Sequence, residues 1–78
     1  MKVRIKPTKS WIKIYIDGVE VVRSWFDYNW DMETRESMID DIVSEFLRLQ
    51  EIKKMNKNSQ IRKFMFNRIY TIIQKTNF

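Results

Sequence analysis

The 78-residue chain contains no cysteine and no histidine. The lack of cysteine excludes disulfide-stapled scaffolds and thiolate metal sites. The lack of histidine excludes imidazole ligands and the Ser-His-Asp and Cys-His pairings of hydrolases. A single glycine is too few for a loop that cradles phosphates. No spacing identifies a lysine base either, so we expect no enzymatic activity, no cofactor and no metal.

The chain also lacks long apolar runs and alanine. No segment approaches the about 18 apolar residues of a membrane span, and no apolar run follows the basic first residues. We therefore expect no membrane partner and a cytoplasmic location. The absence of alanine, with abundant isoleucine and lysine, is typical of AT-rich coding sequences. Such small reading frames are common on phages and mobile elements, which predicts an origin of that type and action in the host cytoplasm.

Fifteen basic and ten acidic residues give a formal net charge of +5, which favours polyanionic partners. Residues 2–13 carry five basic side chains and no acid, and residues 53–75 carry seven and no acid. Between them, residues 27–45 hold seven acidic side chains against Arg35 alone. Two arrangements stay open: the basic ends fold against the acidic middle and neutralise it, or basic surface faces an external anion.

Residues 12–22 have the pattern of a β-hairpin, with two β-branched runs separated by Asp17-Gly18. This dipeptide suits a type I′ turn, in which both central residues need positive φ. A two-residue loop predicts that Ile14 lies opposite Val21, unless a bulge near Val21 shifts the later pairing. We expect one face, which packs on a helix, to hold Ile12, Ile14, Ile16, Val19 and Val21, and the other to hold Trp11, Lys13, Tyr15, Glu20, Val22 and Ser24.

A first strand is predicted where Val3 and Ile5 alternate with basic residues, before a turn at residues 7–10. Residues 1–26 then form an antiparallel sheet. A helix is predicted over residues 31–55, with Asp31 as its N-cap and Thr34 as the competing cap. Its buried stripe is expected to consist of Met38, Ile39, Ile42, Phe46, Leu49 and Lys53.

A second helix is predicted over residues 59–76, capped by Ser59. Its apolar face is expected to hold Ile61, Met65, Ile69, Ile72 and Ile73. The whole pattern predicts an α+β fold in which a three-stranded antiparallel meander, or a hairpin alone, is followed by two antiparallel helices. We expect residues 1–78 to form a single domain.

Two groups of basic residues are candidates for nucleic-acid binding. The solvent face of the sheet interleaves cations, which meet phosphates, with aromatic rings, which stack on bases or pack on sugars. The second helix carries a separate basic line. The alternatives are a half-exposed sheet stabilised by cross-strand pairs and an ordinary solvated helix face. The candidate residues are Arg4, Lys6, Lys9, Trp11, Lys13, Tyr15 and Arg23 in the sheet, and Arg62, Lys63, Arg68 and Lys75 in the helix.

Trp11 before Asp17-Gly18, then Ser24-Trp25-Phe26, then Thr34-Arg35-Glu36 opening a helix, form a run that spans about residues 2–47. This run resembles the small DNA-binding domain at the N-terminus of tyrosine-recombinase integrases. In that family three strands enter the major groove and one helix backs them. The resemblance implies DNA contacts from Arg4, Lys6, Trp11, Lys13 and Arg23, and it leaves the second predicted helix without a counterpart.

An aromatic cluster, residues 25–30, lies at the predicted junction of sheet and helix. Aromatic side chains dominate interface hot spots and also fill the ends of small cores. We expect Trp25 and Phe26 to be buried and Trp30 to be the exposed member. The acidic first helix is either a solvated face or a mimic of DNA phosphates. A protein-binding site would use Trp25, Tyr28, Trp30, Asp40 and Asp41.

Two functions from different classes follow. The first is a small basic nucleic-acid-binding protein, with the type of nucleic acid unspecified. The alternative is a phage-encoded inhibitor of a host protein, of anti-defence or anti-CRISPR type, that uses the aromatic cluster. A homodimer is compatible with either function, because a thin core and an excess of aromatic residues both favour dimer formation.

Overall fold

A computed structural model describes residues 2–50 and 55–76, with side chains at 2–50 and 59–76. Three strands, β1 (Val3–Pro7), β2 (Trp11–Ile16) and β3 (Val19–Trp25), precede two helices, α1 (Met32–Leu49) and α2 (Met55–Lys75). The strands form one antiparallel sheet in the order β1-β2-β3. The predicted α+β fold, a meander followed by two helices, is confirmed.

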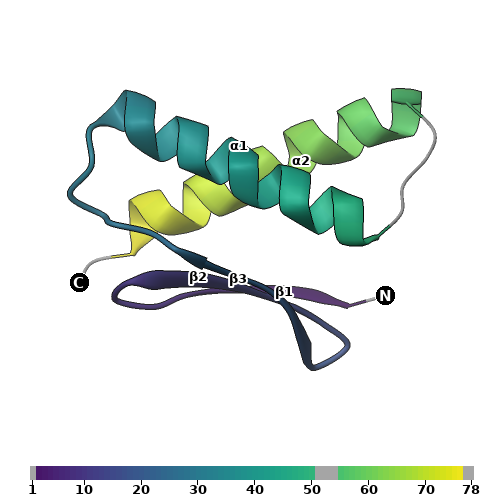
Figure 1. Ribbon diagram of the computed structural model, residues 1–78, viewed down its shortest axis with the longest axis horizontal. Helices are drawn as coiled ribbons and strands as arrows, with labels where there is room; N and C mark the ends of the chain where they lie inside the picture. The colour runs from purple at the N-terminus through teal and green to yellow at the C-terminus, as the bar shows by residue number, and fades with distance from the viewer. Residues whose placement is uncertain (1, 51–54, 77–78) are drawn as a thin grey trace.

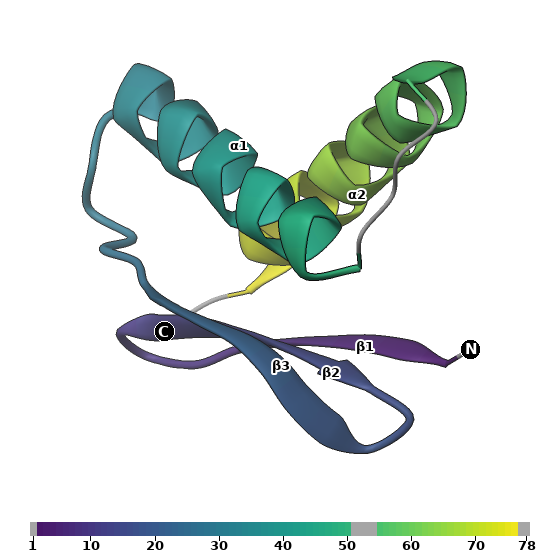
Figure 2. The same cartoon turned by 45° about the vertical axis from the view of Figure 1, so that its right-hand side comes forward.

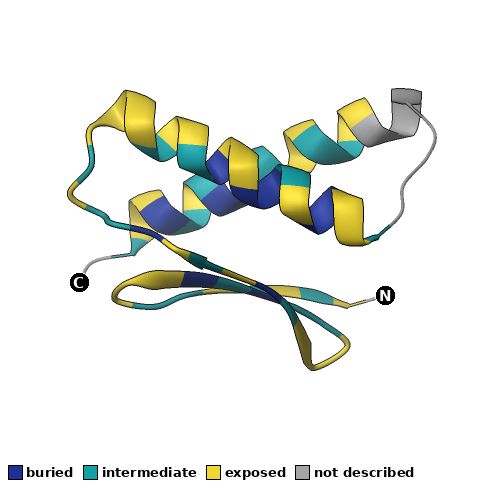
Figure 3. Ribbon diagram, viewed as in Figure 1, coloured by how far each residue is buried: buried dark blue, intermediate teal, exposed yellow. Residues whose placement is uncertain are grey.

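The sheet and the helices form two layers (Figure 1). The helices cross each other above the same face of the sheet, and the other face is covered by no described element, as Figure 2 also shows. Buried residues gather where the layers meet (Figure 3). The core consists of Ile12, Ile14, Val22, Phe26, Ile39, Ile42, Val43, Phe46, Leu47, Met65, Ile69 and Ile73. One face of the sheet is therefore left to meet solvent or a partner.

The turn between β2 and β3 has the predicted geometry. Asp17 and Gly18 have φ values of 49° and 84°, so both residues adopt the left-handed region that a type I′ turn requires. The Asp17 carboxylate also accepts a hydrogen bond from the backbone N–H of Lys2 at 2.9 Å, and the Asp17 N–H donates to the Lys2 carbonyl. The turn therefore fixes the start of β1 as well as the hairpin.

A register shift between Ile14 and Tyr15 changes the pairing of β3. Ile14 pairs with Val22 instead of Val21, so Val22 is buried and Val21 only partly so. The expected inner position of Val21 and outer position of Val22 are therefore wrong, because one extra residue reverses the alternation. The same shift turns Ser24 inward, opposite Ile12. Val19 is 64% exposed, since it lies at the turn itself.

The helix α1 begins as predicted and ends earlier. Asp31 is the N-cap, and its carboxylate accepts a hydrogen bond from the Thr34 N–H at 2.8 Å. The helix ends at Leu49 rather than at residue 55, two residues after Leu47, the last residue that it buries in the core. Leu49 is 42% exposed, which corrects its place in the buried stripe, and Val43 takes part in the core. The buried face is thus broader than a narrow stripe, and Lys53 lies outside the described residues.

The helix α2 begins at Met55, four residues before the predicted start. Ser59 is therefore an internal residue and not the N-cap, because residues 56–58 contain no glycine or proline that would stop the helix. Met65, Ile69 and Ile73 are buried as expected, and Ile61 packs against them partly buried. No described helix is long and apolar enough to cross a membrane.

Candidate nucleic-acid interface

Strand alternation places a row of three cations on the uncovered face of the sheet. Lys6 on β1 lies opposite Lys13 on β2, and Lys13 lies opposite Arg23 on β3. Their neighbours Ile12 and Ile14 are buried, so the cations are on the other face. The bulge at Val21 completes the row, because without it Arg23 would lie opposite Ile12 on the inner face. We call Lys6, Lys13 and Arg23 the cation row.

The charge of the cation row is only partly balanced. Arg23 is paired with Glu20 through two hydrogen bonds of 3.2 Å. Within the described parts of the chain, neither Lys6 nor Lys13 forms an ion pair. Like charges directly opposite each other destabilise a sheet. The row is therefore an unfavourable arrangement for the isolated protein and a favourable one beside an anion.

Aromatic side chains lie on both sides of the cation row. Trp11 and Trp25 are opposite each other at one end of the sheet, and their side chains are 40% and 51% exposed. Tyr15 lies two residues beyond Lys13 on the other side, between Arg4 and Glu20. The interleaving of cations and aromatic rings expected for this face is thus present in the geometry.

A hollow opens beside Tyr15 at the β1 side of the sheet. It has a volume of about 280 Å³ and is lined by Lys2, Arg4, Lys6, Tyr15 and Gly18. The three cations suit a phosphate group, and the phenol ring suits a flat ring attached to that phosphate. Lys2 and Gly18 were not among the expected site residues. The alternation of residues 2, 4 and 6 could have indicated Lys2, since these positions share one face.

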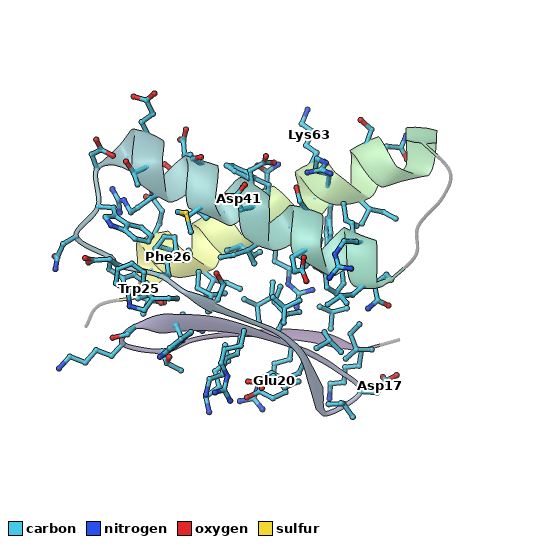
Figure 4. All side chains as sticks on the ribbon, viewed as in Figure 1. Asp17, Glu20, Trp25, Phe26, Asp41 and Lys63 are labelled. Carbon is cyan, nitrogen blue, oxygen red and sulfur yellow. The ribbon has the colours of Figure 1, made fainter. Side chains whose placement is uncertain are left out.

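Trp25 and Trp30 exchange the roles expected from the sequence. Phe26 is fully buried as predicted, but Trp25 is the exposed residue and Trp30 is half-buried. The reason is alternation along β3: since Trp25 faces outward opposite Trp11, Phe26 turns inward. The rings of Trp25 and Trp30 meet edge-to-face at 5.0 Å, and Trp30 lies 5.3 Å from Phe26. Figure 4 shows Phe26 between the layers and Trp25 at the level of the sheet.

The basic residues of α2 do not join the cation row. Arg62 donates hydrogen bonds to Ser44 Oγ at 2.6 Å and to an Asp40 carboxylate oxygen at 3.5 Å. Arg68 donates to the Val3 carbonyl at 3.1 Å, so it joins α2 to β1. Lys63 points away from the sheet, as Figure 4 shows, and Lys75 is exposed in the last turn. The basic residues of the sheet and those of α2, predicted together from the sequence, therefore form two separate groups. Lys9, another predicted residue, is exposed in the turn after β1.

The described ion pairs bear on the open question of internal neutralisation. Arg62–Asp40 links the basic C-terminal part to the acidic middle, whereas Arg23–Glu20 and Arg48–Glu45 are local pairs. No described ion pair links the basic N-terminal part to the acidic middle. Most of the basic residues of the sheet therefore keep their charge available to an external anion.

Five residues of the acidic middle lie on α1, in the helix layer: Glu33, Glu36, Asp40, Asp41 and Glu45. Asp40 and Asp41 are exposed, and Glu45 accepts hydrogen bonds from Arg48 at 2.6 and 3.1 Å, which lower the pKa of its carboxyl. Across residues 2–50 and 55–76, no group of three or more acidic residues could hold a metal ion. The alternative protein-binding residues are divided, since Trp25 belongs to the sheet and Asp40 to α1.

Tyr28 lies in the connection between β3 and α1. Its ring meets Phe26 edge-to-face at 5.1 Å, and burial raises the pKa of its hydroxyl. Tyr28 and Trp30 are both half-buried against the core, so they contribute to the fold as well as to the surface.

Comparisons of the chain with protein-family models, curated proteins and solved structures find no match.

Proposed function

We propose that this protein is a small, non-catalytic nucleic-acid-binding protein of phage or mobile-element type, and that the outer face of the sheet is its interface. The cation row carries this proposal: three cations lie abreast on adjacent strands, and among the described side chains only Arg23 of the three has a carboxylate partner. Cations held in this way release counterions when they meet phosphates, which supplies salt-dependent affinity.

The distribution of charge between the two layers supports the same face. The sheet presents Arg4, Lys6 and Lys13 on one side, where Glu20 is paired with Arg23, and α1 presents exposed acids such as Glu36 and Asp41 in the other layer. A polyanion is attracted to the first surface and repelled by the second. The protein is therefore oriented as it approaches, with the sheet toward the nucleic acid.

The test uses two lysines that differ in position and not in charge. Lys13 is in the centre of the cation row, and Lys63 points away from the sheet (Figure 4). Affinity for labelled duplex DNA, single-stranded DNA and RNA is measured by fluorescence anisotropy across a salt series. We expect Lys13→Ala and Arg4→Ala each to weaken binding and to reduce the salt slope by about one.

Lys63→Ala is the matched control, because it removes the same charge from another surface. We expect it to change affinity far less than Lys13→Ala does. If the two variants weaken binding equally, net charge alone drives association and the proposed interface is wrong. The proposal also fails if wild-type binding is weak on every probe and vanishes near physiological salt.

One observation favours a second candidate, an inhibitor of a host protein of anti-CRISPR type. Trp25 is half-exposed and is held by Trp30, which is a feature of interface hot spots. In that case Tyr28→Ala and Trp30→Ala abolish inhibition in folded variants, and Lys13→Ala mainly slows association. A result in which both aromatic variants inhibit as the wild type does would remove this candidate.

A further inference from the structure

Beyond nucleic-acid binding in general, we infer that the sheet face takes single strands in preference to duplexes, with unpaired bases stacked on Trp11 and Trp25. This inference rests on the proposed function and concerns the same surface. The two tryptophans are cross-strand neighbours at one end of the cation row, and both are exposed. The tryptophans lie next to the cation row, so a nucleic-acid strand that crosses the row along β2 would meet their rings.

The core accounts for this tryptophan pair only in part, because Trp25 meets the core-packed Trp30 but both tryptophans stay exposed. Phe26 fills the space between the layers and is fully buried, whereas Trp11 and Trp25 pair across β2 and β3 and are 40% and 51% exposed. Large aromatic rings left in water on a sheet are typical of surfaces that stack on nucleobases. The exposed rings therefore indicate a ligand with flat apolar faces.

Between a duplex and a single strand, the single strand offers such faces, because its bases are unpaired. In a duplex both faces of each base are covered by its neighbours, and proteins read the base edges with polar side chains. The end of the sheet presents two indoles where a duplex reader would place arginine, asparagine or glutamine. A single strand leaves its bases free to stack on the indoles while its phosphates meet Lys6 and Lys13.

The spacing along β2 alternates stacking and charge. Trp11, Lys13 and Tyr15 share the outer face, and side chains two apart on a strand are about 6.6 Å apart. Tyr15 borders the hollow lined by Lys2, Arg4 and Lys6. A single strand that runs along β2 thus meets a ring, a cation and a second ring in order.

The stacking surface is also fixed in place. The Trp25 ring is held at 83° against Trp30 at 5.0 Å, and Trp30 is held against the buried Phe26 at 5.3 Å. Because the ring is fixed before a base arrives, little side-chain entropy is lost on binding.

The experiment compares probes of equal phosphate number: oligo(dT), oligo(rU) and a hairpin duplex. Anisotropy gives the affinity of wild type, Trp11→Ala, Trp11→Leu and Trp11→Phe for each. We expect both single strands to bind more tightly than the duplex. Trp11→Ala and Trp11→Leu should weaken single-strand binding by about tenfold or more, and Trp11→Phe should retain most of it. Trp11→Leu keeps an apolar side chain, so it remains informative if Trp11→Ala does not fold.

Phe64→Ala is the matched control, because Phe64 is 61% exposed on α2, away from the outer sheet face. We expect this variant to bind all three probes as the wild type does. We also expect oligo(dT) to quench the tryptophan fluorescence of the wild-type protein. The inference is overturned if the duplex binds as tightly as the single strands or if Trp11→Leu has no effect. In that case a loss of binding in Lys13→Ala but not in Lys63→Ala still supports the sheet interface, whereas equal effects of both lysine variants refute the proposed function itself.

Discussion

Lys6 and Lys13 lie directly opposite each other on the outer face of the sheet, with Arg23 next in the same row. Neither lysine has an ion-pair partner among the described side chains. Cross-strand pairs of like charge are destabilising, and pairs of opposite charge contribute about 0.2–1 kcal/mol each. The row therefore lowers the stability of the protein alone, in the way that an anion-binding surface does.

Lys13→Glu should raise stability and abolish nucleic-acid binding. The new carboxylate lies between Lys6 and Arg23 and replaces two repulsive pairs by two attractive ones, each worth about 0.2–1 kcal/mol. Thermal unfolding followed by circular dichroism measures the change, with Lys63→Glu as a charge-matched control that should give no such gain. If Lys13→Glu unfolds at a lower temperature than the wild type, the row is not under repulsion.

Phe26→Ala and Trp25→Ala should differ strongly in stability although the residues are adjacent. Phe26 is fully buried, and its loss should cost about 3–5 kcal/mol, which approaches the whole stability of a small domain. Trp25 is half-exposed, and its loss should cost about 1 kcal/mol, mainly through its contact with Trp30. Urea unfolding measures both, with Phe26→Leu as a milder variant that still folds. Similar losses for the two residues would contradict their assigned faces.

Gly18→Ala should destabilise the hairpin without any steric clash. No atom lies within 4 Å of an added Cβ, but the φ of 84° is one that alanine disfavours by about 1–2 kcal/mol. Asp17→Asn is the control, because asparagine also adopts positive φ and keeps an oxygen for the Lys2 N–H. Chemical denaturation should show a loss for Gly18→Ala and little change for Asp17→Asn. If Gly18→Ala is as stable to denaturant as the wild type, the conformation of this turn does not limit the stability of the protein.

The Asp31 N-cap should give α1 a stability component that depends on pH. The hydrogen bonds from Thr34 lower the pKa of the Asp31 carboxyl in the folded protein. Its stabilising effect is therefore present above the unfolded carboxyl pKa of about 3.9 and is lost as pH falls through the lower folded value. Asp31→Asn should keep the cap and lose this component, and Asp31→Ala should lose both. Melting temperatures between pH 2 and pH 7 test this; the same acid sensitivity in wild type and Asp31→Asn would contradict it.

Local chemistry explains which parts of the fold could be predicted from the sequence. The Asp17-Gly18 turn and the Asp31 cap depend on residues next to each other, and both were predicted. The end of α1 at Leu49 and the start of α2 at Met55 depend on where the helices meet the core, and no glycine or proline marks either position. These boundaries therefore could not be predicted.

The candidate site was predictable only in part. The outward positions of Lys6 and Lys13 follow from simple alternation, and the sequence shows them. The place of Arg23 beside Lys13 depends on the bulge at Val21, which the sequence indicates only as two adjacent valines. The outward position of Trp25 has the same origin, since one residue of register decides its face of the sheet, whereas Trp30 lies in the connection after β3. Arg62 and Arg68 bind partners distant in sequence, Asp40 and Val3, which no local pattern reveals.

The sheet interface is tested most directly by mapping amide chemical-shift changes in the isotope-labelled protein as an oligonucleotide is added. We expect changes concentrated on the outer sheet face, at Lys6, Lys13 and Arg23 and their neighbours, with α1 little affected. Changes concentrated around Lys63 on α2, or spread evenly over the surface, would contradict the sheet interface.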